Sequence, residues 1–212
     1  MWVERFVRAK PVARSPLLLL IGLRCSGKTT LGKAAASVLR IAFEDLDLRV
    51  LAAMQVQTVT EAFHTCGEVA FRAAEAKALK EIIDGKVAGI VALGGGTPLV
   101  ASACACIRAA QAQGWLRVAL LHPGLDALVQ RLQSSRGDRP RLTHSDAQSD
   151  AQSDADSDAA EVVRLSRQRL PLYRSLADIT VDTRLPQKEC VQRLRALLTS
   201  GRSIWSWPQA SE

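Results

Sequence analysis

The segment that most constrains this chain lies near its N-terminus, where Gly22–Thr29 reads GLRCSGKT. It fits the pattern GxxxxGK[ST] at every position, between an apolar run that predicts a strand and a stretch that predicts a helix. Gly22 and Gly27 let the backbone curl so that successive N–H groups face one anion, and the helix N-terminus adds its positive end. The segment therefore predicts a phosphate-binding loop, with Lys28 against the phosphate oxygens and the Thr29 hydroxyl on Mg²⁺.

Apolar runs alternate with helix-like stretches along the rest of the chain. The expected strands are Leu17–Gly22, Ile41–Asp45, Val87–Leu93, Leu116–Leu121 and Ile179–Asp182. The expected helices are Thr29–Leu39, Thr60–Asp84, Ala101–Gln113, Leu125–Ser134, Ala159–Ala177 and Lys188–Thr199. Because the strand runs are continuously apolar, both faces of the sheet should be covered by helices. This order predicts an α/β fold with a five-stranded parallel sheet flanked by helices.

The length of 212 residues fits one domain, which we expect to span the whole chain. Its core should cover about 16–199, with an N-terminal extension at 1–15 and a C-terminal tail at 200–212. The segment Ser145–Asp158 reads SDAQSDAQSDADSD, which is acidic and has no large apolar residue. Such a repeat cannot offset its own ordering entropy, so we expect a flexible surface insertion there.

Composition excludes several classes of function. No run of eighteen or more apolar residues exists, so no membrane span is expected. The five cysteines are odd in number and match no disulfide framework or zinc spacing, which predicts reduced thiols and a cytoplasmic location. The net charge of +7 indicates an anionic partner, and arginines dispersed among motifs suit a small phosphorylated ligand better than nucleic acid.

Two further groups of residues follow predicted strands, at the end where parallel sheets bind ligands. Asp45 and Asp47 end the second predicted strand and, being two residues apart, are expected to point the same way. One carboxylate could organise Mg²⁺, and the other could accept a proton from an attacking hydroxyl. Gly94–Gly96 follows the third strand and would let the backbone approach a ligand closely. From spacing alone, a solvated loop start is as open as a ligand site for the two aspartates, and a flexible turn is the alternative for the three glycines.

Taken in order, the motifs of this chain resemble those of the shikimate kinase family. No motif after the phosphate-binding loop is specific by itself, but the order of the motifs and the gaps between them are specific. The resemblance covers about residues 16 to 199. The segments that carry the resemblance are Gly22–Thr29, Phe43–Asp47, Gly67–Glu75, Gly94–Gly96, Arg139-Pro140 and Arg169–Tyr173.

The resemblance implies a P-loop kinase of the nucleoside-monophosphate-kinase-like fold, with a substrate-binding helical region and a mobile lid around Arg139. It implies transfer of the γ-phosphate of ATP to the 3-hydroxyl of shikimate, with Mg²⁺ near Thr29 and Asp45. Lys28, Asp47 and Arg139 would be the catalytic residues. The nucleotide would be bound by Gly22, Cys25, Ser26, Gly27, Lys28, Thr29, Thr30 and Arg139. Shikimate would be bound by Asp47, Arg72, Gly94, Gly95, Gly96 and Arg169, the two arginines clamping its carboxylate.

Some points stay open at this stage. Arg131 and Arg136 both fit as the arginine beside the adenine. The closest rival function is another small-metabolite kinase of the same fold, such as a gluconate kinase. A rival of another class is a nucleotide-binding regulator without turnover, and a nucleic-acid-binding role ranks last because it would rest on net charge alone. We expect a monomer with ATP and shikimate as its partners.

Overall fold

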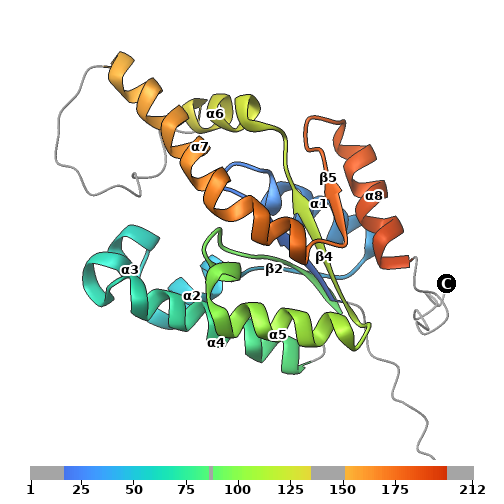
Figure 1. Ribbon diagram of the computed structural model, residues 1–212. Helices are drawn as coiled ribbons and strands as arrows, with labels where there is room; N and C mark the ends of the chain where they lie inside the picture. The colour runs from blue at the N-terminus through green and yellow to red at the C-terminus, as the bar shows by residue number, and fades with distance from the viewer. Residues whose placement is uncertain (1–16, 86–87, 135–150, 200–212) are drawn as a thin grey trace, which may run out of the picture.

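The structure is a computed structural model that describes residues 17–85, 88–134 and 151–199. Its centre is a five-stranded sheet in the order β2-β3-β1-β4-β5, in which every recorded pairing is parallel (Figure 1). The strands are β1 (Leu17–Ile21), β2 (Ala42–Asp45), β3 (Gly89–Ala92), β4 (Leu116–Leu121) and β5 (Ile179–Val181). The helices are α1 (Lys28–Leu39), α2 (Leu46–Met54), α3 (Val59–Cys66), α4 (Glu68–Gly85), α5 (Ala101–Ala112), α6 (Leu125–Ser134), α7 (Ala151–Leu176) and α8 (Gln187–Thr199), with a short 3₁₀ helix η1 (Thr97–Leu99).

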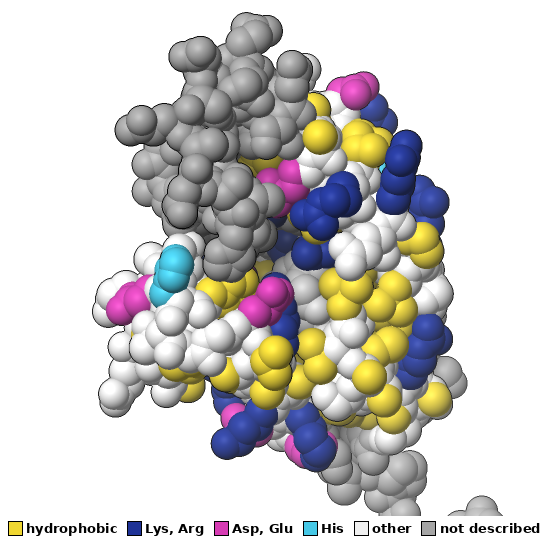
Figure 2. All heavy atoms as spheres, turned by 60° about the vertical axis from the view of Figure 1, so that its left-hand side comes forward, with side chains coloured by type: hydrophobic (Ala, Val, Ile, Leu, Met, Phe, Trp, Pro, Cys, Tyr) yellow, Lys and Arg dark blue, Asp and Glu magenta, His cyan; other side chains and the backbone are white. Residues whose placement is uncertain are grey.

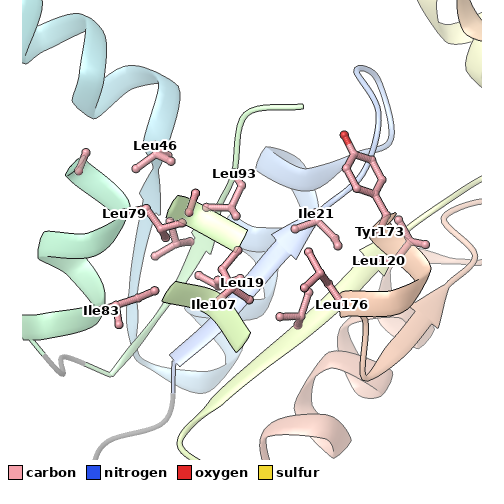
Figure 3. Close-up of a cluster of buried hydrophobic side chains, with 14 of the residues drawn as sticks. Leu19, Ile21, Leu46, Leu79, Ile83, Leu93, Ile107, Leu120, Tyr173 and Leu176 are labelled. Carbon is pink, nitrogen blue, oxygen red and sulfur yellow. The ribbon is translucent and has the colours of Figure 1, made fainter. Parts of the chain in front are cut away.

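The middle strand β1 shows why its sequence is continuously apolar. Successive side chains of a strand point to opposite faces, and here both faces are covered. Leu17, Leu19 and Ile21 pack into a cluster with side chains of helices α2 to α7, part of which Figure 3 shows. Leu18 and Leu20 pack into a second cluster with α1 and α8. The predicted layered α/β architecture is thereby confirmed.

Parallel pairing brings three strand ends to one edge of the sheet. Asp45, the last residue of β2, is paired with Ala92 of β3, and Leu20 of β1 is paired with that same residue. The segments that follow these strands are the phosphate-binding loop, the start of α2 and Gly94–Gly96. The order of the strands thus places all three predicted motifs side by side.

Two boundaries in the first half differ from the prediction. The expected helix Thr60–Asp84 is two helices, because Gly67 has a φ of 82°, a left-handed value that ends α3 and that glycine adopts without strain. The second difference is α2, which the apolar pattern did not reveal. Asp45 is the N-cap of α2, and its carboxylate accepts a hydrogen bond from the Asp47 N–H. Asp47 therefore lies in the first turn of a helix, and its expected place on a strand is wrong.

The acidic repeat is only partly described. Residues 145–150 lie outside the described residues, and 151–158, where the sequence predicts a flexible insertion, form the first two turns of α7. Ala151 and Ala155 favour a helix intrinsically. Although α7 is long, neither it nor any other helix in the described ranges is apolar enough to cross a bilayer.

Candidate active site

The phosphate-binding loop connects β1 to α1 as the pattern predicts. Gly27 is the N-cap of α1, and Lys28 is its first residue. The Lys28 ammonium donates hydrogen bonds to the carbonyl oxygens of Gly22 (2.8 Å) and Leu23 (2.9 Å), which holds it across the loop. Desolvation lowers the pKa of Lys28 to about 8, against the opposing effect of nearby carboxylates, chiefly Asp47. The loop thus combines a helix N-terminus with a cation, which suits a polyphosphate.

Oxygen donors for a divalent cation lie next to this loop. The Thr29 hydroxyl donates to Asp45 Oδ2 at 2.8 Å, so a hydroxyl and a carboxylate meet at the start of α1. Mg²⁺ prefers such hard oxygen ligands and usually binds one or two protein groups together with phosphate oxygens and water. No cluster of three or more His, Cys, Asp or Glu side chains forms a cage within the described ranges. Thr29 and Asp45 therefore fit a cation that arrives with a nucleotide.

Asp47 and Glu75 form a pair of carboxylates close to Asp45. Desolvation, followed by the charges of Glu75 and Asp45, raises the pKa of Asp47 to about 6. Carboxylate oxygens of Asp47 and Glu75 both reach the position that a Cβ at Gly94 would occupy, so any larger residue there would collide with them. The Asp47 carboxylate is therefore more basic than that of an ordinary aspartate, and it lies against the backbone of Gly94.

Glu75 also anchors Arg72, one turn earlier on α4. Glu75 is fully buried, and it accepts hydrogen bonds from Arg72 Nη1 at 2.7 Å and from the Thr97 hydroxyl at 2.5 Å. Arg72 Nε and Nη2 both donate to Glu68 Oε1, at 3.2 and 3.1 Å. The guanidinium lies directly on Gly96, where a Cβ would collide with it. Arg72 is thus fixed beside the glycine segment.

Helix α7 supplies a second arginine beside the glycine segment. Arg169 Nη1 lies 3.0 Å from the position of a Cβ at Gly95, and the Tyr173 hydroxyl donates a hydrogen bond to the Gly95 carbonyl. The buried Arg169 Nε donates to no acceptor within the described ranges. A buried donor of this kind is normally satisfied, so an anionic ligand fits there. Two guanidinium groups therefore lie beside Gly94–Gly96, close to the phosphate-binding loop.

Arg131 on α6 lies at the far side of that loop. Its Nη1 donates to the Thr183 hydroxyl at 3.0 Å and to the Cys25 carbonyl at 3.4 Å, and its Nη2 donates to the Thr183 carbonyl at 2.7 Å. Of the two arginines left open above, Arg131 is therefore next to the loop. Arg136 and Arg139 lie outside the described residues, so the structure places neither.

The structure brings most of the predicted site residues to one edge of the sheet. Lys28, Thr29, Asp45, Asp47, Arg72, Gly94, Gly95, Gly96 and Arg169 gather there, with Gly22, Cys25, Ser26, Gly27 and Thr30 in or beside the loop. The face turned forward in Figure 2 is hollowed, and Lys, Arg, Asp and Glu side chains lie along that hollow. The sequence motifs assign Glu75 no role, although its spacing from Arg72 places both on one face of a helix. The hydroxyl of Tyr173 was also missed.

Comparisons with known proteins agree with one another. The family model described as "Shikimate kinase" matches residues 24–199. Proteins named shikimate kinase from Brucella canis and Bradyrhizobium diazoefficiens are each 32% identical to this chain, over 177 and 186 residues. These matches cover 84% and 85% of this chain and 78% and 80% of the two relatives.

Solved structures show the same fold. Shikimate kinase from Bacteroides thetaiotaomicron has a TM-score of 0.71 and 27% identity, and the match covers 86% of this chain and 98% of that one. Shikimate kinase from Acinetobacter baumannii in complex with shikimate has a TM-score of 0.72 at 24% identity, covering 90% and 96% of the two chains. The predicted P-loop kinase fold is therefore confirmed.

Proposed function

This chain belongs to the shikimate kinase family, and we propose that it transfers the γ-phosphoryl group of ATP to the 3-hydroxyl of shikimate, giving shikimate 3-phosphate and ADP. The observation that carries the proposal is the pair of guanidinium groups, Arg72 and Arg169, beside Gly94–Gly96 at the edge that also holds the phosphate-binding loop. Guanidinium groups bind a carboxylate with fixed geometry, and glycines leave room for a ring beside the backbone.

On this proposal each group has a distinct task. Lys28 and the N–H groups of the loop hold the β- and γ-phosphates, and Arg131 lies where it can contact the nucleotide on the far side of the loop. Arg72 and Arg169 hold the carboxylate of shikimate, which turns its ring hydroxyls toward Asp47. The role of Arg139, as a further cation that contacts the phosphates, stays a prediction from the family resemblance.

Asp47 is the residue we assign to the acceptor hydroxyl. With a pKa of about 6 its carboxylate is largely ionised near neutral pH and can accept a proton. As the hydroxyl oxygen bonds to the γ-phosphorus, the bond from that phosphorus to the bridging oxygen of ADP breaks, and the hydroxyl proton moves to Asp47. Thr29 and Asp45 would hold Mg²⁺, which when bound neutralises charge on the phosphate oxygens.

A coupled assay of ADP formation tests the proposal. We expect ADP to form with Mg²⁺ and ATP only when shikimate is present, and Lys28→Met to abolish turnover because it removes the ammonium from the phosphates. Circular dichroism would check that the variant stays folded. Turnover with gluconate instead of shikimate would favour the rival small-metabolite kinase. ATP binding without turnover on any hydroxy acid would favour a regulator.

The monomeric state and cytoplasmic location stay predictions from the sequence.

A further inference from the structure

Tyr173 is the single tyrosine of the chain, and it links helix α7 to the glycine segment. Its side chain is fully buried, one turn after Arg169. Figure 3 shows the ring near Leu120 and Leu176, with its oxygen pointing away from the apolar cluster. That oxygen donates its hydrogen bond to the carbonyl of Gly95, a residue 78 positions away in the sequence. A side chain otherwise suited to the core thus reaches the backbone at the candidate acceptor site.

We infer that Tyr173 is a positioning residue, whose hydroxyl fixes the Gly95–Gly96 peptide so that the Gly96 N–H is presented to the acceptor substrate. This inference rests on the proposed function. The described residues include no cis peptide bond, and in a trans peptide the carbonyl and the following N–H point in opposite directions. Holding the Gly95 carbonyl therefore directs the Gly96 N–H away from Tyr173. Within the described ranges that N–H donates to no acceptor, so it is available to a ligand.

The glycine segment needs such a tether. Three consecutive glycines have no side chains to pack and lose the most backbone entropy when they become ordered. The segment is tied at both ends, where the Thr97 N–H donates to the Gly94 carbonyl at 3.2 Å and the Leu99 N–H donates to the Gly96 carbonyl at 3.0 Å. Between them, the carbonyl of the Gly95–Gly96 peptide is held by Tyr173 of α7. Burial raises the pKa of the Tyr173 hydroxyl, which therefore keeps its proton and remains a donor.

Tyr173→Phe tests the inference, because it keeps the ring in the core and removes the hydroxyl, which donates to the Gly95 carbonyl and also lies beside the Arg169 guanidinium. We expect the KM for shikimate to rise about tenfold, corresponding to about 1.4 kcal/mol. The KM for ATP should change less than about twofold, since the phosphate-binding loop makes no use of this hydroxyl. Ser166→Ala is the matched control. It also removes a buried hydroxyl from α7, one that has no hydrogen-bond partner within the described ranges, and it should leave both KM values unchanged.

A second measurement uses the full-length protein without a substitution. Because the chain has one tyrosine, growth on 3-fluorotyrosine gives a single ¹⁹F signal from position 173. We expect saturating shikimate alone to shift this signal. An unmoved signal would overturn the inference, as would a Tyr173→Phe enzyme whose shikimate KM stays within twofold of the parent. Equal rises in both KM values, with a lowered melting temperature, would show a merely structural role and would also overturn it. If the parent protein makes no ADP with shikimate, the proposed function itself fails.

Discussion

Arg72 is held by two carboxylates of α4 that differ in their exposure. Glu75 is fully buried, whereas the Glu68 side chain retains 62% of its exposure. An exposed ion pair contributes little because water and salt screen it, but removing one partner of a buried pair leaves a charge without compensation. The two contacts look alike by distance, yet the burial of Glu75 makes it the one that fixes Arg72.

We therefore predict unequal effects of two otherwise identical substitutions. Glu75→Gln should raise the shikimate KM at least tenfold and lower the free energy of unfolding by about 1–3 kcal/mol, because a buried charged hydrogen bond to Arg72 is lost. Glu68→Gln, the matched control on the same helix, should change either quantity only slightly, with a KM within about threefold. Steady-state kinetics and urea unfolding of both variants would check this. Similar losses in the two variants would contradict the assignment.

The residues that could be predicted from the sequence are those that belong to a contiguous motif. Lys28 and Thr29 were predictable because the loop, strand and helix lie within one short segment. Glu75 was not predictable, because its interactions with Thr97 and Asp47 form only in the folded chain. The hydrogen bond of Tyr173 depends on long-range packing, so no local pattern could reveal it.

At the scale of elements, the five strands were predictable because each is a short apolar run at a distinct place in the sequence. Helix α2 was not predicted, because its first residues continue the polar end of β2. What separates the two elements is a side-chain cap, in which Asp45 accepts the Asp47 N–H. This cap moves Asp47 from the predicted strand to a helix but keeps both aspartates at the candidate site. Asp45 faces Thr29, while Asp47 turns toward Gly94 from the first turn of the helix.

The start of α7 permits a prediction about the acidic repeat. The first buried residue of α7 with a described side chain is Val162, and the site residues Arg169 and Tyr173 come later. Excising Ser145–Asp158 should therefore leave kcat and both KM values within about threefold, under about 1 kcal/mol. Long surface segments are tolerated because loop closure costs only about 0.6 kcal/mol per doubling of length. Steady-state kinetics at low and high salt would check this expectation.

The control for that deletion keeps the length and removes the charge. Asparagine at the five aspartates of the repeat leaves a segment of the same size, so any difference between it and the deletion reports length alone. Electrostatic effects should fade at high salt, because the Debye length falls to about 3 Å at 1 M. A tenfold loss of activity that persists at high salt would show that the repeat takes part in the catalytic cycle.

At the scale of the whole molecule, the two halves of the candidate site come from different parts of the chain. The phosphate side is built by β1 and α1, which are contiguous in sequence. The acceptor side is assembled from α2, α4, the segment before η1, and α7, which the parallel sheet brings to the same edge. A contiguous motif can be recognised from sequence alone, whereas an assembled surface requires the fold. This division also implies that either side can be disabled without the other.

Ligand-induced stabilisation should display that division. A ligand that binds only the folded state stabilises it by about 2.7 kcal/mol at a hundredfold excess over its Kd. In the parent protein, ADP with Mg²⁺ and shikimate should therefore each raise the melting temperature. Lys28→Met should lose most of the ADP effect and keep most of the shikimate effect, because the Lys28 ammonium is hydrogen-bonded to carbonyl oxygens of the phosphate-binding loop. Arg72→Ala should show the reverse, because its guanidinium lies on Gly96. Differential scanning fluorimetry of the three proteins with each ligand would measure this, and a variant that lost both responses while remaining folded would show that the two sides are not separable.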